Sequence, residues 1–192
     1  MLKKDLFLGI SPEELKKRKK AQQPTFLAPM LATLTTDYFS SKEWIYEQKY
    51  DGERCLAFKH NGKVTLKSRN NRIINTEYPE LVQALELQKA DNFIIDGEII
   101  AVNKKGVSSF QLLQGRINLQ NKAQISARIK AIPIYFCIFD VLYVEGYDIR
   151  ALSLVARKII LKKLLIYKKV LRYSSHRSPN GLIYYKKACN LH

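Results

Sequence analysis

The sequence feature that most constrains the fold is an apolar decapeptide, residues 93–102, which is interrupted at its centre by Asp96-Gly97-Glu98. A run of this composition is typical of a strand that is covered on both faces of a sheet. Because buried strands seldom tolerate acids, the two carboxylates require partners. One interpretation places Glu98 at the wall of a pocket, as a ligand for Mg²⁺ or for a ribose hydroxyl. The other is an Asp-Gly bulge that turns Glu98 towards water.

A β-hairpin is predicted before this strand, because residues 54–59 and 64–68 flank Asn61-Gly62, a strong short-range hairpin signal. Hairpins mixed with helices, without regular alternation, predict an α+β fold of mainly antiparallel sheets flanked by helices. The remaining predicted elements are strands at 44–49 and 134–142, helices at 77–87, 153–170 and 181–189, and a helix capped by Ser108.

The two ends of the chain are basic, whereas its centre is nearly neutral. Within a net charge of +16, residues 1–20 contribute seven Lys or Arg against three acids, and residues 150–192 contribute eleven against none. This distribution suits a protein that lies along a polyanion such as a nucleic acid. Basic residues that serve only to keep the protein soluble would give the same charge composition.

Residues 1–24 are predicted to form a basic N-terminal arm and linker, so that the folded domain spans residues 25–192. Ser11 has the place of an N-cap and Pro12 that of the first helical residue. The basic run that follows predicts that this helix continues through Lys20.

The apolar pattern predicts a soluble intracellular protein without a membrane partner. No apolar run approaches the roughly 20 residues of a membrane span, and the N-terminus is too interrupted for a signal peptide. The three cysteines, Cys55, Cys137 and Cys189, lack the paired spacing of a zinc site or a disulfide framework. We expect them to be ordinary buried thiols.

The octapeptide from Glu47 to Arg54 places Lys49 between carboxylates and beside an Asp-Gly turn. A lysine in water has a pKa near about 10.4, so a nucleophilic lysine requires desolvation or nearby positive charge. Arg54, or a metal held by Glu98, could supply that charge, which makes Lys49 a candidate nucleophile. The alternative is a strand that ends in a turn, with Lys49 as a solvated surface charge.

Two further segments carry cations or aromatic rings near strand ends. Ser68 and Arg69 follow a predicted strand and suit either a phosphate contact or a solvated loop. Phe136 and Phe139 lie in a strand that ends at Asp140. An aromatic ring at this place can stack on a purine or can simply belong to the core.

Five short motifs therefore follow one another along the chain: Glu47-x-Lys49-x-Asp51-Gly52-x-Arg54, Ser68-Arg69, Asp96-Gly97-Glu98, Phe136-x-x-Phe139-Asp140 and Leu142-Tyr143-x-x-Gly146. In this order they resemble the nucleotidyltransferase (adenylation) domain of ATP-dependent DNA ligases, most closely the ligase module of the bacterial ligase D type. The likeness covers about residues 25–189. It implies a ligase-type, ATP-grasp-like nucleotidyltransferase fold and a role in DNA repair in the bacterial cytoplasm, associated with the nucleoid.

The resemblance also implies a role for each site residue. Lys49 would attack the α-phosphate of ATP to form lysyl-AMP, with Asp51 and Arg54 as further catalytic residues and Mg²⁺ or Mn²⁺ as the metal. The AMP would then pass to the 5′ phosphate of a nicked or broken DNA duplex, and a repair partner protein is a further expectation. The residues implied to bind the nucleotide are Glu47, Gln48, Lys49, Arg54, Arg69, Glu98, Phe136 and Phe139; those implied to contact DNA phosphates are Ser68, Arg69 and Arg116; and the implied metal ligand is Glu98.

The chain departs from the ligase pattern near its C-terminus. The family's Glu-Gly-Val/Ile-x-x-Lys and Lys-x-Lys motifs, and its OB-fold domain, have no counterpart before residue 192. We therefore expect a ligase fold that is incomplete at its C-terminus. Two alternatives stand beside a DNA ligase domain: a catalytically impaired ligase fragment that binds nucleotide or DNA, and an RNA ligase or capping-type nucleotidyltransferase.

Overall fold

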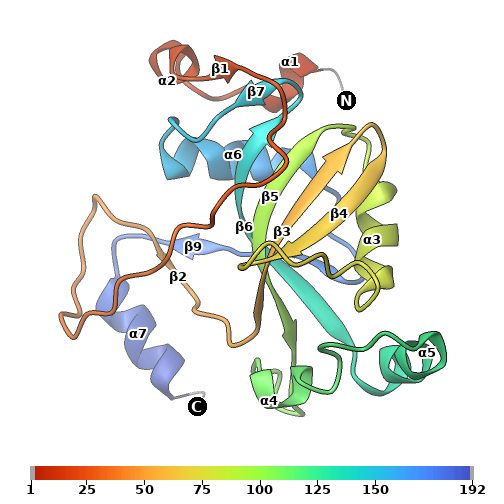
Figure 1. Cartoon of the computed structure of the whole chain (residues 1–192). Coiled ribbons are helices and arrows are strands. Elements are labelled where there is room, and N and C mark those ends of the chain that lie inside the picture. The colour runs from red at the N-terminus through yellow and green to blue at the C-terminus, as the bar shows by residue number, and fades with distance from the viewer. Residues whose placement is uncertain (1–2, 191–192) are drawn as a thin grey trace.

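The computed structural model describes residues 3–190 of the chain, which form two sheets and seven helices (Figure 1). The helices are α1 (Lys3–Leu6), α2 (Pro12–Lys16), α3 (Pro79–Glu86), α4 (Phe110–Leu113), α5 (Lys122–Ala131), α6 (Leu154–Leu164) and α7 (Gly181–Cys189). The strands are β1 (Lys19–Lys20), β2 (Tyr46–Glu47), β3 (Glu53–His60), β4 (Lys63–Ser68), β5 (Phe93–Ala101), β6 (Ile134–Val144), β7 (Tyr147–Asp148), β8 (Leu171–Tyr173) and β9 (His176–Arg177).

The larger sheet is centred on β5, the strand predicted from the apolar decapeptide. Its strands lie in the order β1-β7-β6-β5-β3-β4, all antiparallel, and β8 adds to β6 in parallel. In β3 and β4, Phe58 is opposite Thr65, and both turn residues, Asn61 (φ 48°) and Gly62 (φ 81°), have the positive φ that a type I′ turn requires. The predicted hairpin and the predicted α+β antiparallel architecture are confirmed.

Residues alternate along β3 between two cores on opposite faces of this sheet. Cys55 and Ala57 belong to the larger core, to which α3 and α6 contribute leucine and isoleucine side chains. Leu56 and Phe58 pack on the other face with a smaller cluster, which Leu27 helps to cover. Burial on both faces explains why the central strands have continuous apolar sequences.

The N-terminal segment packs on the body of the protein. α2 ends four residues before Lys20, because the residues that follow form β1 and pair with β7. Leu6 and Phe7 are buried in the larger core, and the Arg18 guanidinium lies 4.8 Å from the ring centroids of Phe7 and Tyr147. The predicted helix through Lys20 is therefore wrong, and the basic segment is not detached. A domain boundary near residue 24 stays a prediction.

Other differences from the sequence predictions follow from where backbone groups find partners. The strand expected at 44–49 is only the two residues of β2. The helix expected at 153–170 ends with α6, because Leu165 is extended (φ −120°, ψ 153°) and the chain returns to the sheet as β8. Ser109, not Ser108, caps α4, and Asn121 caps α5, a helix that the sequence analysis did not predict.

The cysteine and membrane expectations have different outcomes. Cys55 and Cys137 are buried thiols as expected, whereas Cys189 is exposed at the end of α7. Within residues 3–190, none of the helices has the length and apolar character that a membrane span requires.

The second sheet contains β2 and β9, in which Glu47 is opposite His176. The predicted helix α7 is confirmed and begins against this sheet. A Cβ atom on Gly181 would lie 2.3 Å from the Tyr46 ring, so glycine permits the close approach. The Leu182 N–H also donates to Ser40 Oγ (3.0 Å).

A buried lysine joins the hairpin to α3. Lys59 is 1 % exposed, and its Nζ donates to the carbonyl oxygens of Glu86 (2.9 Å) and Gln88 (2.7 Å). These carbonyls lie at the C-terminal end of α3, where helical carbonyl groups lack partners within the helix. Lys59 thus caps a helix from a neighbouring strand.

Replacing this capping lysine should destabilise the fold. We expect Lys59→Met to lower the free energy of unfolding by about 1–3 kcal/mol, because two carbonyls lose their buried donor. Urea unfolding followed by circular dichroism measures the change. Lys63→Met, at an exposed position of β4, is the control and should change stability by less than about 0.5 kcal/mol. Equal effects of the two substitutions would contradict the capping role.

Candidate active site

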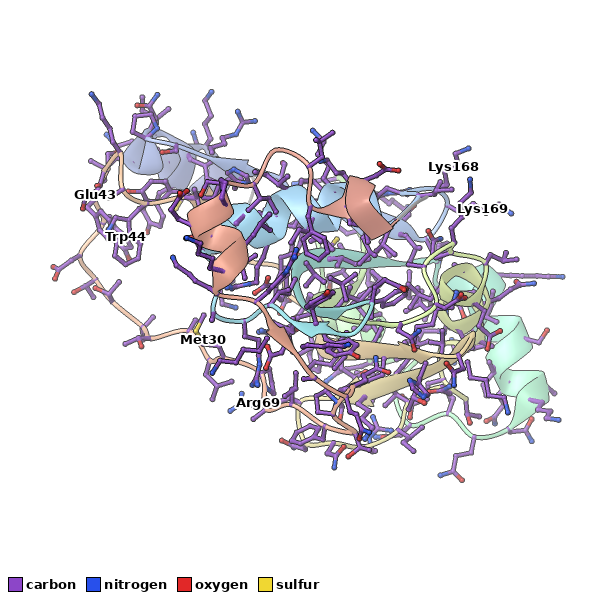
Figure 2. The ribbon with its side chains drawn as sticks, turned by 90° about the horizontal axis from the view of Figure 1, so that it is seen from above. Met30, Glu43, Trp44, Arg69, Lys168 and Lys169 are labelled. Carbon is purple, nitrogen blue, oxygen red and sulfur yellow. The ribbon has the colours of Figure 1, made fainter. Side chains whose placement is uncertain are left out.

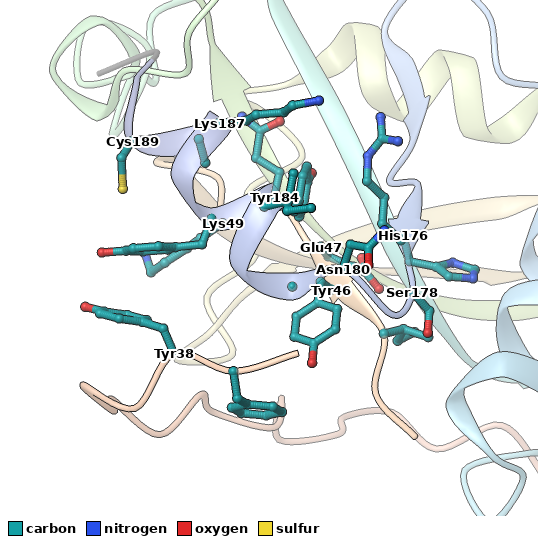
Figure 3. Close-up of a pocket in the computed structure, with 18 of the residues that line it drawn as sticks. Tyr38, Tyr46, Glu47, Lys49, His176, Ser178, Asn180, Tyr184, Lys187 and Cys189 are labelled. Atoms are coloured by element: carbon teal, nitrogen blue, oxygen red, sulfur yellow. The ribbon is translucent and has the colours of Figure 1, made fainter. Parts of the chain in front are cut away.

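The candidate nucleophile borders a cavity in the described part of the protein. Lys49 is exposed in the loop between β2 and β3, at a cavity of about 1440 Å³ that β2, α7 and residues 105–107 enclose. Figure 3 shows Lys49 on one side of α7, with Tyr46 and Glu47 of β2 on the other. Gln48 lines the same cavity. Of the first sequence motif, Glu47, Gln48 and Lys49 line this cavity, whereas Asp51 and Arg54 do not.

The loop that carries Lys49 is anchored on both sides of the Asp-Gly turn. The Asp51 N–H donates to Ser108 Oγ (3.0 Å), and Asp51 Oδ2 accepts from the Phe110 N–H (2.8 Å). Gly52 passes so close to β5 that a Cβ atom there would lie 2.1 Å from the Ile99 carbonyl oxygen. Asp51 thus has the contacts of a residue that orders the loop, and its catalytic role stays a prediction.

Asp96 is buried and has the charged partner that the sequence requires. Arg54 Nε and its second terminal nitrogen lie 2.6 and 2.7 Å from the two Asp96 carboxylate oxygens. Asp140 is opposite Asp96 on β6 and is held in the same way by Arg157, at 2.8 Å from each oxygen. Burial raises the pKa of Asp96, and Arg54 opposes this shift. Two facing carboxylates are thus balanced by two guanidinium groups.

A register shift in β6 directs an aromatic ring to the same place. Asp96 pairs with Asp140 and Gly97 with Ile138, which leaves Phe139 as the extra residue of a bulge. The Arg54 guanidinium lies 4.6 Å from the Phe139 ring centroid, and it also donates to the Met30 carbonyl (3.3 Å). Arg54 is therefore already engaged within the fold, and its contact with a nucleotide stays a prediction, as does stacking by Phe139.

Glu98 matches neither alternative completely. The bulge lies opposite Asp96 and Gly97, in β6, so the expected Asp-Gly bulge is wrong, and Glu98 is partly buried rather than fully exposed to water. Burial raises its pKa to about 7, while Arg54 and Lys49 act in the opposite direction. The influence of Lys49 on this carboxylate places the candidate nucleophile and Glu98 within one electrostatic environment.

The metal prediction depends on Glu98. Residues 3–190 contain no group of three or more His, Cys, Asp or Glu side chains arranged to hold a metal ion. Mg²⁺, however, commonly binds one or two carboxylates and completes its shell with water and substrate phosphates. Glu98 makes no hydrogen bond or ion pair within that range and fits such a single ligand. A protein-only metal site does not fit.

The site contains two residues that the sequence analysis did not identify. Lys158 of α6 forms an ion pair with Glu47 (2.7 Å), and the Ser174 hydroxyl donates to the same carboxylate (3.0 Å). In the sequence analysis Lys158 is counted only among the eleven basic residues of 150–192. Its spacing from Leu154 and Leu161 puts it on the apolar face, which was the available signal for burial.

Two implied binding residues are buried elsewhere, and these predictions are wrong. Arg116 is 0 % exposed; it pairs with Glu80 (2.7 Å) and donates to the backbone carbonyls of Glu77 and Ile132, so it cannot reach DNA. Phe136 is also 0 % exposed and belongs to the larger core, so its ring cannot stack on a base.

The Ser68-Arg69 motif divides into a structural residue and an exposed one. Ser68 is largely buried, and its Oγ accepts from the Arg72 N–H (3.2 Å), which stabilises the loop after β4. Arg69 is exposed. Figure 2 shows it on the same side as Met30, whose carbonyl contacts Arg54. Arg69 therefore remains the better placed phosphate ligand of the pair, as a prediction.

A lysine on an anchored loop, with a cavity beside it and carboxylates on neighbouring antiparallel strands, is an arrangement that suits covalent catalysis by a lysine. The profile of the ATP-dependent DNA ligase domain family matches residues 29–181. The chain belongs to this family.

Individual relatives agree with this assignment. The SPbeta prophage-derived DNA ligase-like protein LigB of Bacillus subtilis is 29 % identical over 163 residues, which cover 85 % of this chain and 56 % of LigB. The bifunctional non-homologous end joining protein LigD of the same organism is 35 % identical, over 71 % of this chain and 23 % of LigD. The crystal structure of the M. tuberculosis LigD ligase domain matches with a TM-score of 0.70 and 29 % identity, over 86 % of this chain and 50 % of that domain. The chain thus spans about half, or less, of these proteins.

The raised pKa of Glu98 predicts a pH-dependent effect on stability. A folded-state pKa of about 7, above the ordinary 4.5, means that the folded protein binds this proton more tightly than the unfolded chain. The resulting stabilisation is present below pH 4.5 and is lost as the pH rises to about 7. Glu98→Gln, which stays neutral, should therefore gain stability relative to the wild type between pH 5 and pH 8 in urea unfolding.

The matched control for this measurement is Glu43→Gln. Glu43 is exposed and projects from the loop before β2 (Figure 2). Its difference from the wild type should be the same at both pH values. A Glu98→Gln difference that also stays constant would contradict burial as the cause of the shift.

Proposed function

We propose that this chain is an adenylation domain of an ATP-dependent DNA ligase, in which Lys49 becomes covalently attached to AMP. The observation that carries the proposal is the position of Lys49, on an anchored loop at the cavity that Glu47 also lines. The Nζ lone pair attacks the α-phosphorus of ATP and forms a P–N bond. The bond from that phosphorus to the bridging oxygen breaks, and pyrophosphate leaves. The family match supports this reaction.

The charges around Lys49 suit phosphoryl chemistry, which depends mainly on positioning and electrostatic stabilisation. When bound, Mg²⁺ would neutralise part of the phosphate charge, and Glu98 would hold it. Arg54 keeps its position through Asp96 and adds positive charge near Glu98. Asp51 limits the movement of the loop, which favours a fixed line of attack.

The further steps that we propose use DNA. The AMP passes from Lys49 to a 5′ phosphate at a DNA break, and a 3′ hydroxyl displaces it, which joins the strands. Relatives named for non-homologous end joining support a role in bacterial DNA repair. We further propose that the chain acts with a repair partner at the nucleoid in the cytoplasm, and not at a membrane. Exposed Arg69 would contact a DNA phosphate.

The covalent step can be tested by labelling. Incubation with [α-³²P]ATP and Mg²⁺ should label the wild-type chain, and Lys49→Ala should abolish the label because the attacking amine is gone. [γ-³²P]ATP should give no label, since pyrophosphate leaves. Lys42→Ala, an exposed lysine in the preceding loop, is the matched control. Label that persists in Lys49→Ala would exclude Lys49 as the nucleophile.

A catalytically impaired fragment that binds nucleotide or DNA is the second candidate. The isolation of Glu98 as a possible metal ligand within residues 3–190 favours it. ATP binding without covalent label would support this candidate over the first. Nick sealing on RNA rather than DNA would instead support the RNA ligase or capping alternative, against the family match.

DNA binding should depend on Arg69 more than on the distant C-terminal lysines. Figure 2 shows Lys168 and Lys169 at the opposite end of the molecule from Met30 and Arg69. We expect Arg69→Gln to reduce the slope of log affinity against log salt by about 1, because one phosphate contact is lost. Lys168→Gln is the charge-matched control and should leave the slope unchanged. Fluorescence anisotropy with a nicked duplex measures both, and a larger effect of Lys168→Gln would reverse the proposed orientation.

A further inference from the structure

Exposed aromatic rings gather where α7 meets the segment that precedes β2, residues 37–45. Tyr38, Phe39, Trp44 and Tyr185 are each between 41 % and 57 % exposed, and we call these four residues the aromatic surface. Single exposed apolar residues are ordinary in soluble proteins, whereas a contiguous group of them marks an interaction site. The aromatic surface therefore requires a ligand or a partner.

The four rings are in contact with one another. Tyr38 and Tyr185 are stacked, with ring centroids 4.1 Å apart and an interplanar angle of 17°. Trp44 meets Phe39 edge to face, at 5.2 Å between centroids. Figure 2 shows Trp44 on the loop at one edge of the molecule. The stacked pair and the exposed indole thus offer flat faces to a planar ligand.

Hydrogen bonds hold this surface in place. The Ser41 N–H donates to the Tyr46 hydroxyl (2.9 Å), which ties the segment to β2. The Leu182 N–H donates to Ser40 Oγ (3.0 Å), which ties it to α7. A ligand would meet rings that are already positioned, so binding costs little ordering of the protein.

Unpaired cations lie beside the aromatic surface. Lys105, Arg177 and Lys187 are exposed and line the cavity next to α7, together with Tyr38. None of the three forms an ion pair within residues 3–190. The Arg177 guanidinium also lies 5.5 Å from the Tyr184 ring centroid.

Nearby acids do not cancel this charge. Glu47 lines the cavity but is paired with Lys158 (2.7 Å), and Asp37 is the other acid that lines it. Glu43 is exposed on the loop, while residues 176–190 contain three Lys or Arg and no acid. The surroundings of the rings are therefore positive and attract a polyanion.

Proteins bind single-stranded nucleic acid by this combination, because unpaired bases stack on aromatic faces while cations contact the phosphates. A duplex hides the faces of its bases by stacking them on each other. We propose that the aromatic surface is a binding site for single-stranded DNA, with its rings stacked on unpaired bases and with Lys105 and Lys187 at the phosphates. The inference goes beyond the proposed function, since it requires neither ATP nor Lys49.

The chain carries its own reporter for this site, because Trp44 is its single tryptophan. Titration of the full chain, without ATP, with an oligothymidylate of about 12 nucleotides should quench Trp44 fluorescence. A blunt duplex of the same length should bind at least about fivefold more weakly, the scale of one lost stacking contact.

Variants of α7 distinguish stacking from general apolar contact. Fluorescence anisotropy of a labelled oligothymidylate should show that Tyr185→Ala weakens binding by at least about fivefold, whereas Tyr185→Phe, which keeps the ring, binds as the wild type does. Ile183→Ala removes an exposed aliphatic side chain of the same helix and should have little effect. If Tyr185→Ala does not fold, Trp44→Leu tests the same prediction on a second ring.

Neighbouring lysines provide a matched pair for the phosphate contacts. Lys105→Gln should reduce the slope of log affinity against log salt by about 0.7, the value for one contact to a single strand. Lys104 is also exposed but does not line the cavity, so Lys104→Gln should leave the slope unchanged.

Three outcomes would overturn the proposal. They are equal affinities for the single strand and the duplex, binding that leaves Trp44 fluorescence unchanged, and tighter binding of an oligouridylate, which would assign the site to RNA. Equal losses in Tyr185→Ala and Ile183→Ala would also reject it, in favour of apolar contact with a protein. Because the titrations contain no ATP, failure of covalent labelling at Lys49 would reject the proposed activity and leave this result intact.

Discussion

The structure depends on the neutralisation of two carboxylates that face each other across its central strands. Asp96 and Asp140 are opposite one another on β5 and β6, in the part of the sheet where the rest of the strand is apolar. Without partners they would repel each other at a high desolvation cost. Arg54 and Arg157 each bind one carboxylate in a bidentate manner, and so allow polar groups to exist in the middle of a buried sheet.

The same pairing organises the candidate site. Asp96 holds Arg54 near Phe139, and two residues further along β5 Glu98 reaches the electrostatic environment of Lys49. Asp96 and Glu98 therefore share one strand and one face of the sheet. A change at Asp96 would alter both the core and the charge near the candidate nucleophile.

The sequence predicts the parts of this protein that local patterns determine. The hairpin at Asn61 and the central apolar strand follow from turn chemistry and hydrophobic runs. Tertiary contacts determine the remaining features. β1 forms because its backbone can pair with β7. Arg116 is buried because its guanidinium forms hydrogen bonds with distant backbone carbonyls and an ion pair with a glutamate. Lys158 was overlooked because counting charges along a helix does not reveal which of them faces inward.

The pairing of β1 with β7 also bears on how the protein avoids self-association. An open strand edge offers unpaired backbone groups to other chains, and proteins protect such edges with short, charged strands. β1 contains only Lys19 and Lys20, both exposed, at one end of the larger sheet. These two lysines, which are part of the positive charge that suggested a nucleic-acid ligand, thus lie at the edge where a second copy of the protein could add a strand. Their charge disfavours pairing of this edge with another molecule.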